Sequence, residues 1–271
     1  MKTRIIVGFS LGVLLLATLY FGGIFYIAAV SLVSLCATYE VAHVITRRGL
    51  RPLVFPAYIC AAAFPFVYHF FGLDAMFILF IGCIVLSVCV IVLCGLSDAF
   101  RSAGTLLLYI YPLSMQICAL LCYASFPRPV GLTAACLAYA APSCADMFAY
   151  FGGTWFGKHK LCEQISPKKT IEGSIAAFIG GLFFGAQVIW LQKLWDGTVP
   201  WWAILVIGFL CGGFSQIGDL FASIIKRWAD VKDFSSVFPG HGGVMDRLDS
   251  ILICSCVVFC GFLLLKYFSL V

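Results

Sequence analysis

Long apolar segments alternate with short polar breaks along almost the whole chain. Each apolar segment runs for about 20 residues, the length that an α-helix needs to cross a bilayer. The segments lack the two-residue alternation of transmembrane β-strands. The pattern therefore predicts an all-α polytopic membrane protein, a bundle of about nine transmembrane helices. The expected crossings are 5–21, 24–45, 53–71, 75–96, 103–125, 129–151, 173–194, 201–222 and 247–268.

The composition supports this interpretation. Of the 271 residues, 63% are apolar and 11% are charged, whereas soluble globular proteins have about 45–50% and about 25%. These values exclude a water-soluble fold, a disordered chain and a nucleic-acid-binding protein. The 14 cysteines lie mostly inside apolar segments, which is typical of apolar packing in a reducing compartment. The first apolar segment lacks a small-residue cleavage site, so we interpret it as a retained crossing rather than a signal peptide.

The basic residues are distributed unevenly between the connections. With nine crossings, fourteen of the 17 Lys and Arg residues fall on the side of the N-terminus. The positive-inside rule then places the N-terminus in the cytoplasm and the C-terminus on the opposite side. Two long polar connections, 152–172 and 223–246, face the cytoplasm in this topology.

The second long connection is bordered by carboxylates at both ends. Asp219 precedes it, and Asp246 and Asp249 follow it at the start of the last crossing. If 219–227 is helical, Asp219 and Lys226 lie on one face of that helix. Three carboxylates beside cations suit Mg²⁺, which binds carboxylate and phosphate oxygens. We therefore expect these carboxylates to converge on one metal; the alternative is a salt-bridged interfacial loop.

Between these carboxylates lies a glycine-rich loop, Pro239–Gly243, whose backbone can approach phosphate oxygens closely. His241 in this loop is interpreted as a phosphate donor or a neighbour of the metal. His159, in the basic first connection, is expected to have no partner. Both histidine interpretations rest on the neighbouring residues in the sequence.

The first long connection ends in a lysine pair. Ser166 followed by Pro167 predicts a helix N-cap with proline at the first helical position. Lys168 and Lys169 would then oppose the helix dipole, which indicates a polyphosphate bound at the helix start. The alternative is a lysine cluster that contacts anionic lipid headgroups.

Three further acidic residues lie in or beside apolar segments. Glu40 and Asp98 stand alone and are interpreted as helix caps or interfacial ion pairs. Asp146 lies near the start of the first long connection. It is a candidate for a further metal ligand or for a carboxylate that shapes a base.

The run Ser223–Asp249 resembles the signature of phosphatidate cytidylyltransferases, also called CDP-diacylglycerol synthases. Its pattern is Ser223-x-x-Lys226-Arg227-x4-Lys232-Asp233-x-Ser235-x-x-Phe238-Pro239-x-His241-Gly242-Gly243-Val244-x-Asp246-Arg247-Leu248-Asp249, over 27 residues. The Asp146 region and the segment Ser166–Gly173 also resemble this family. The first 125 residues resemble it only in hydropathy.

The resemblance implies a membrane enzyme that joins CTP and phosphatidic acid to give CDP-diacylglycerol and pyrophosphate, commonly as a homodimer. It implies that Asp219 and Asp246 bind a Mg²⁺ ion, with a monovalent cation such as K⁺ in the same site. It also implies that Ser166–Gly173 binds the nucleotide. The substrate phosphatidic acid belongs to the membrane lipid, and CTP requires an active site on the cytoplasmic face. In a bacterium, the location would be the inner (cytoplasmic) membrane.

Spacing and resemblance together give a full set of expected roles within a single integral-membrane domain, 1–271. Residues 1–125 are expected to be mainly scaffold and residues 126–271 to be the catalytic part. The expected catalytic residues are Asp146, Lys226, Arg227, His241 and Arg247. The expected CTP and phosphate ligands are Ser166, Lys168, Lys169, Thr170, Glu172, Gly242 and Gly243. The expected metal ligands are Asp219, Asp246 and Asp249.

Two different functions also fit parts of the pattern. The first is a cytidylyltransferase for an isoprenoid lipid phosphate or a CTP-dependent lipid kinase, which would use a similar site on another lipid. The second is an ion transporter, which would favour carboxylates near the membrane midplane over carboxylates at one face.

Overall fold

The computed structural model describes residues 2–93, 99–163, 165–238 and 242–271. The described chain is helical apart from one small hairpin, so the predicted all-α class is confirmed. It forms two compact units. Unit 1 contains Met1–Ile117 and Ile225–Arg247, and unit 2 contains Cys118–Ile224 and Leu248–Val271. The segment 225–247 thus groups with the N-terminal helices rather than with the residues from 126 onward.

Within the described ranges, seven helices are long and apolar enough to cross a membrane, and Gly12–Phe21 is a shorter apolar helix. The seven are Gly23–Thr46, Val54–Leu93, Arg101–Ala124, Arg128–Phe156, Ile171–Trp195, Trp201–Trp228 and Met245–Tyr267. Many of their large apolar side chains are exposed, such as Leu93 and Ile78, as lipid contact requires. The protein is therefore a polytopic membrane bundle. The nine crossings and their orientation remain predictions.

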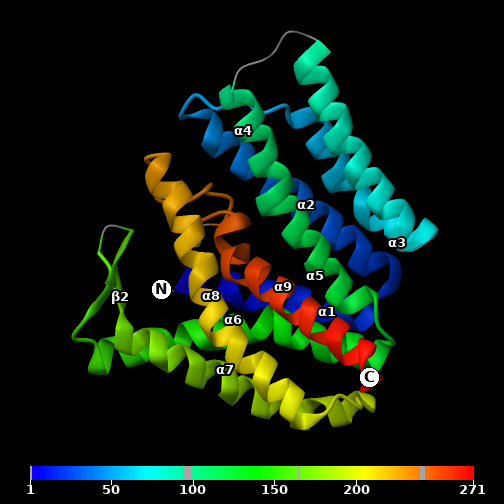
Figure 1. Ribbon diagram of the computed structural model, residues 1–271. Coiled ribbons are helices and arrows are strands. Elements are labelled where there is room, and N and C mark those ends of the chain that lie inside the picture. Colours follow the sequence, from blue (N-terminus) through cyan, green and yellow to red (C-terminus); the bar gives the residue numbers. More distant parts are fainter. Residues whose placement is uncertain (1, 94–98, 164, 239–241) are drawn as a thin grey trace. The chain divides into compact units, whose positions relative to one another are not determined.

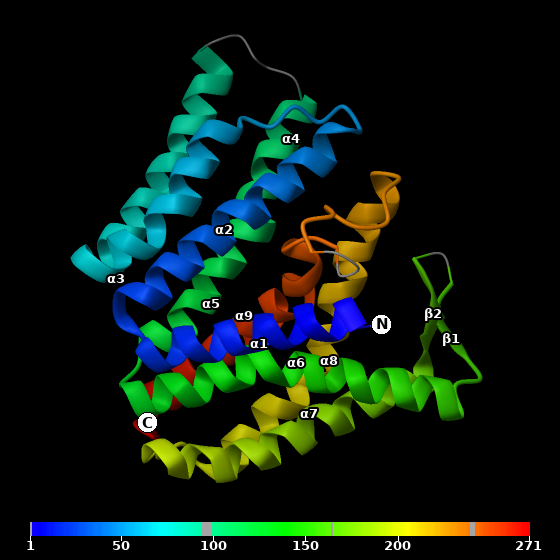
Figure 2. The same cartoon turned by 180° about the vertical axis from the view of Figure 1, so that it is seen from behind.

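Unit 1 contains the N-terminal helices of the chain. It contains α1 (Lys2–Phe21), α2 (Gly23–Thr46), α3 (Val54–Leu93), α4 (Ala99–Leu108) and the π-helical turn η1 (Tyr109–Leu113). Figure 2 shows α2 beside α3. Gly22, with φ 61°, separates α1 from α2 at the predicted break. Gly72, with φ 85°, interrupts the helical backbone of α3, close to the predicted break between 53–71 and 75–96.

Unit 2 combines a helix pair, a hairpin and most of the last two long helices. Its elements are α6 (Arg128–Phe156), β1 (Lys160–Cys162), β2 (Ser166–Thr170), α7 (Ile171–Leu191), the 3₁₀ turn η2 (Gln192–Trp195) and the larger parts of α5 (Ser114–Ala124), α8 (Trp201–Trp228) and α9 (Met245–Tyr267). Helices α6 and α7 lie side by side, and the hairpin of β1 and β2 extends from their end (Figure 1). The hairpin was not predicted from the sequence.

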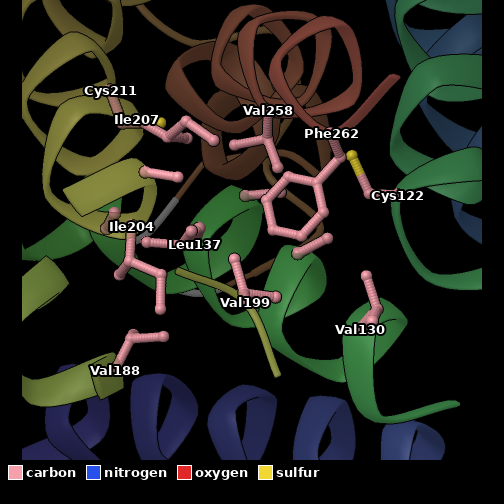
Figure 3. Close-up of a cluster of buried hydrophobic side chains, with 14 of the residues drawn as sticks. Cys122, Val130, Leu137, Val188, Val199, Ile204, Ile207, Cys211, Val258 and Phe262 are labelled. Atoms are coloured by element: carbon pink, nitrogen blue, oxygen red, sulfur yellow. The ribbon is translucent and has the colours of Figure 1, made fainter. Parts of the chain in front are cut away.

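The core of unit 2 is formed by apolar side chains from α5, α6, α8 and α9. Figure 3 shows Phe262 and Val258 of α9 facing Leu137 and Ile204. All four are fully buried. Their packing fixes the helices that carry the acidic residues of this unit.

Helices α7 and α8 are in direct backbone contact. A Cβ atom at Gly181 of α7 would lie 2.1 Å from the carbonyl oxygen of Gly208 in α8. A Cβ atom at Gly212 would lie 2.5 Å from the carbonyl oxygen of Ala177. Small residues at both positions allow this approach, as is usual between transmembrane helices.

Candidate active site

The polar connection that precedes α7 is a β-hairpin followed by a capped helix. Strand β2 pairs antiparallel with β1, with Thr170 opposite Lys160 and Ser166 opposite Cys162. Helix α7 begins after Thr170, whose hydroxyl accepts a hydrogen bond from the Gly173 N–H at 3.2 Å. The N-cap is therefore Thr170.

The prediction that Ser166 is the N-cap, with Pro167 at the first helical position, was wrong. The backbone from Ser166 to Thr170 is extended and its partner is a strand. Lys168 and Lys169 consequently lie in β2 and not in the first helical turn, so they do not oppose the dipole of α7. The helix dipole therefore gives no reason to expect a polyphosphate at this position.

Glu172 holds the start of the hairpin. Its carboxylate accepts hydrogen bonds from the backbone N–H groups of Lys158 at 3.1 Å and His159 at 3.3 Å. It also lies 2.7 Å from Nδ1 of His159. The expectation that His159 has no partner was therefore wrong, because the turn before β1 brings it to the first turn of α7. The signal in the sequence was an acid in a first helical turn close to an upstream histidine.

A lysine–aspartate pair joins the hairpin to α8 within unit 2. Nζ of Lys169 lies 2.6 Å from Asp219 and donates to the carbonyl oxygen of Gln216 at 3.4 Å. The side chain of Lys169 is 21% exposed and that of Asp219 is 34% exposed. The side chain of Gln216 accepts from the Ser174 hydroxyl at 2.6 Å and donates to the Ser174 carbonyl oxygen at 3.1 Å. The lysine predicted to meet phosphate therefore lies beside one of the predicted metal ligands.

Asp249 approaches the same stretch of α8. A Cβ atom at Gly218, the residue before Asp219, would lie 2.4 Å from the carbonyl oxygen of Asp249. Only glycine permits this contact between α8 and α9. Asp249 is 8% exposed, and its carboxylate accepts the N–H of Ser250 at 2.7 Å. The structure thus brings the backbone next to Asp219 against the backbone of Asp249, while the shared carboxylate site remains a prediction.

Asp146 belongs to the same unit. Its carboxylate lies 3.5 Å from the hydroxyl of Ser250, the neighbour of Asp249. The Asp146 residue is exposed and lies inside α6, which continues to Phe156. The prediction placed Asp146 near the start of the first long connection, 152–172, whereas the helix extends into that range and leaves Asp146 well before its end.

A second lysine–aspartate pair lies in unit 1 and is much more buried. Nζ of Lys226 lies 2.8 Å from Asp246, and the side chains are 12% and 3% exposed. The second carboxylate oxygen of Asp246 accepts the N–H groups of Phe234 at 2.8 Å and of Gly243 at 2.9 Å. Asp246 therefore fixes both the lysine and the connection between α8 and α9.

The predicted helices around this connection are confirmed. Residues 219–227 lie within α8, and Asp246 is in the first turn of α9. Gly242 has φ 79°, a conformation that glycine adopts without strain. Arg227 and Arg247 are exposed. His241, like Pro239, Gly240 and Asp98, lies outside the described residues.

Glu40 has a larger role than its position in the sequence suggested. Its side chain is buried within unit 1, and its carboxylate accepts three hydrogen bonds from the segment 235–245. The predicted helix cap is correct in kind, but the helix that it caps is α9. No local signal in the sequence links Glu40 to a helix that begins 205 residues later.

Carboxylates are the ligands that a divalent cation such as Mg²⁺ prefers, and in this structure Asp219 and Asp246 are each paired with a lysine. A carboxylate has about four acceptor positions, and the hydrogen bonds of Asp246 with Lys226, Phe234 and Gly243 use three of them. Asp219 is paired with a lysine whose long side chain can move aside for, or remain beside, a cation and its phosphate ligand. Among the described residues, no three His, Cys, Asp or Glu side chains are close enough to form a ready metal cage. The convergence of Asp219, which belongs to unit 2, with Asp246, which belongs to unit 1, remains a prediction.

Comparison with known proteins gives a consistent result. The profile of the cytidylyltransferase family matches residues 2–265. A phosphatidate cytidylyltransferase of Mycobacterium bovis is 32% identical over 269 residues, covering 93% of this chain and 85% of the relative. Those of Synechocystis sp. and Staphylococcus saprophyticus are 41% and 39% identical, over 48% and 46% of this chain. In these two cases the match spans less than half of the relative, 43% and 47% of its length.

Proposed function

Because the chain belongs to the cytidylyltransferase family, we propose that it is a CTP:phosphatidate cytidylyltransferase, a nucleotidyltransferase of phospholipid biosynthesis. The observation that carries this proposal is the match of the family profile to residues 2–265, which includes both lysine–aspartate pairs. The named relatives, among them one covered over 85% of its length, support the same activity.

The reaction requires no covalent enzyme intermediate. An oxygen of the phosphatidate phosphate forms a bond to the α-phosphorus of CTP, and the bond from that phosphorus to the α–β bridging oxygen breaks. CDP-diacylglycerol and pyrophosphate are the products. Both reactants are anionic, so the enzyme must offset their repulsion and align them.

The basic side chains of the site suit this task. Lys169 and Lys226 are each held by one aspartate, so their ammonium groups are positioned before a substrate arrives. Lys168 and Arg227 are exposed and can follow a mobile polyphosphate. We assign these four residues to phosphate charge. Arg247, which is exposed in the first turn of α9, is assigned to the same substrates, as are His241, Gly242 and Gly243 of the loop before α9.

Asp219, Asp249 and Asp246 are the residues that would hold Mg²⁺, with K⁺ as an accompanying monovalent cation. Such a cation would neutralise phosphate oxygens and orient them for in-line displacement. Asp146, beside Ser250, would assist Asp249. Ser166 and Thr170 maintain the hairpin that carries the lysine pair, and Glu172 fixes its base.

We further propose nine crossings, with α3 divided at Gly72, and a cytoplasmic N-terminus. The asymmetry of the basic residues supports this topology, because fourteen of 17 fall on one side. The site then lies on the cytoplasmic face, where CTP is available. A homodimer in the cytoplasmic membrane is the expected assembly.

The decisive experiment follows the label of two forms of CTP. Purified protein in detergent is mixed with Mg²⁺, phosphatidic acid and CTP labelled at either the α- or the γ-phosphorus. The proposal predicts that the α-label enters the lipid fraction and that the γ-label is released as pyrophosphate. A γ-label in the lipid would instead establish a CTP-dependent kinase.

Two further arms test a different lipid substrate and a transport function. An isoprenoid phosphate that is converted faster than phosphatidic acid would change the proposed lipid. Ion flux in liposomes without CTP turnover would replace the proposed enzyme by a transporter. The variant Asp74→Asn, an acid-to-amide change at an exposed position in α3, provides the control for all arms.

A further inference from the structure

The C-terminal half of α2 contacts the start of α9, and the turn after α2 contacts the end of α8. All of these contacts lie within unit 1. At the start of α9, the Glu40 carboxylate accepts the N–H groups of Met245 at 2.8 Å and Val244 at 3.0 Å. It also accepts the hydroxyl hydrogen of Ser235 at 2.6 Å. Glu40 thus contacts the residues just before Asp246 and, at Ser235, an earlier part of the same connection.

The contact suits the electrostatics of a helix start. Met245 is the first residue of α9, and the first N–H groups of a helix have no acceptor within the helix. A carboxylate there satisfies these donors and interacts favourably with the partial positive charge of the helix dipole. Glu40 supplies from another helix what a capping residue of α9 would supply locally.

The neighbouring glycine is adapted to this carboxylate. A Cβ atom at Gly243 would lie 2.4–2.6 Å from the carboxylate atoms of Glu40. The N–H of the same Gly243 donates to Asp246 at 2.9 Å. Gly243 therefore lies next to the Glu40 carboxylate and is hydrogen-bonded to Asp246, so it connects the two acids.

Arg48 makes the corresponding contact at the other end of the connection. Its Nε donates to the carbonyl oxygen of Trp228 at 2.7 Å, and Trp228 is the last residue of α8. A guanidinium there satisfies a terminal carbonyl and complements the negative end of the helix dipole. The accompanying contact to Asp230 is 4.0 Å long and exposed, so it contributes little. The end of α2 and the turn after it therefore supply an anion to α9 and a cation to α8.

A packing role alone does not explain a carboxylate at this position. Burying a charged group in a helix of a membrane bundle is costly unless its hydrogen bonds are satisfied. Glu40 is 3% exposed, and its donors Ser235, Val244 and Met245 belong to the connection and the start of α9 rather than to α2 or α3. An apolar side chain would fill the space without this cost. The hydrogen-bond donors that satisfy the buried Glu40 carboxylate are therefore supplied by the connection and the start of α9.

We propose that Glu40 is a positioning residue for Asp246 and Lys226, and that Arg48 assists it at the other end of the connection. The inference rests on the proposed function, because it assigns the connection to the active site. Glu40 does not touch the reacting atoms in this assignment. It holds the loop in which Asp246 receives the Phe234 and Gly243 N–H groups.

The test combines hydrogen exchange with turnover. In Glu40→Gln, one acceptor oxygen is replaced by an NH₂ group that faces backbone donors. We expect the amides of Val244 and Met245 to exchange about 10-fold faster or more, as befits the loss of a charge-assisted hydrogen bond. We expect kcat to fall about 10- to 100-fold, the size that a small misplacement of reacting groups produces. The melting temperature and the exchange of α6 and α7 should change little.

Three variants complete the design. Glu40→Asp retains the charge and should recover part of both the exchange protection and kcat. Ser235→Ala removes one donor to Glu40 and should have a smaller effect in the same direction. Asp74→Asn is the matched control and should match the wild type in both measurements.

The exchange measurement separates this inference from the proposed function. Wild-type protein without cytidylyltransferase activity would remove the proposed function, whereas the protection of Val244 and Met245 by Glu40 would still be measured. Unchanged exchange at these two amides in Glu40→Gln, in a protein that remains folded, would overturn the inference. So would wild-type kcat in that variant, or an Asp variant no better than the Gln variant.

Discussion

The two lysine–aspartate pairs differ in how deeply they are buried, each within its own unit. Lys226 and Asp246 are almost completely buried, and Asp246 also receives two backbone N–H groups. Lys169 and Asp219 are partly exposed, and the lysine comes from a hairpin that extends from the helices. The same two residue types therefore serve two purposes. The buried pair organises its surroundings, and the open pair can exchange its partners when an anionic substrate arrives.

The largest effect is expected for Asp246→Asn. The change leaves Lys226 buried beside a neutral group and weakens the Phe234 and Gly243 hydrogen bonds. Breaking a buried ion pair costs about 3–5 kcal/mol, and loss of a carboxylate at the metal should lower kcat about a thousandfold. Thermal melting and the α-label assay measure the two effects. A variant that melts like the wild type would show that the pair is not structural.

Asp219→Asn should separate activity from stability. Its activity should fall about a hundredfold or more, because the residue is expected to bind metal. Its free energy of unfolding should change by only about 0–1 kcal/mol, as is usual for partly exposed ion pairs. The comparison of melting temperatures with those of Asp246→Asn tests the contrast directly. Equal destabilisation of the two variants would contradict it.

Lys169→Gln should affect the nucleotide more than the fold. The variant keeps much of the side chain but loses the charge that offsets phosphate repulsion. We expect the KM for CTP to rise about 10-fold, equivalent to about 1.4 kcal/mol, with melting unchanged. Initial rates over a range of CTP concentrations provide the measurement. Lys160→Gln, which removes a neighbouring hairpin lysine bonded to the Pro167 carbonyl, is the matched control and should change the KM less.

The smallest effect is expected for Glu172→Gln. The amide cannot accept from both backbone N–H groups and the His159 ring as the carboxylate does. The hairpin should loosen at its base, and the KM for CTP should rise only about two- to threefold, since an exposed hydrogen-bond network contributes little. Proteolysis within 158–170 should become faster. Unchanged proteolysis would show that another contact holds the hairpin.

The sequence predicted the helices well because membrane helices leave a strong local signal. Continuous apolar segments require no knowledge of their partners, and the break at Gly22 lies where α1 and α2 are separated. The places of Asp219 in α8 and of Asp246 in the first turn of α9 were also predicted, because both are polar positions at the ends of apolar segments.

The start of α7 was predicted wrongly because its signal was ambiguous. Proline fits both the first helical turn and an extended strand, so Ser166–Pro167 did not distinguish them. The deciding interaction was pairing with Lys160–Cys162, which depends on the turn between the strands. Thr170, four residues later, is also a preferred capping residue. The role of Glu40 was still harder to predict, because its hydrogen-bond partners lie 195–205 residues away in the sequence. Only the tertiary fold brings them together.

The backbone contact of α7 with α8 restricts how a lipid reaches the protein. At Gly181 and Gly208 the helices are too close even for an added methyl group, so no hydrocarbon tail can slip between them. The proposed diacyl substrate is therefore expected to approach along other helix surfaces. Larger side chains at these glycines would force α7 and α8 apart and distort unit 2 without creating an entrance for a lipid.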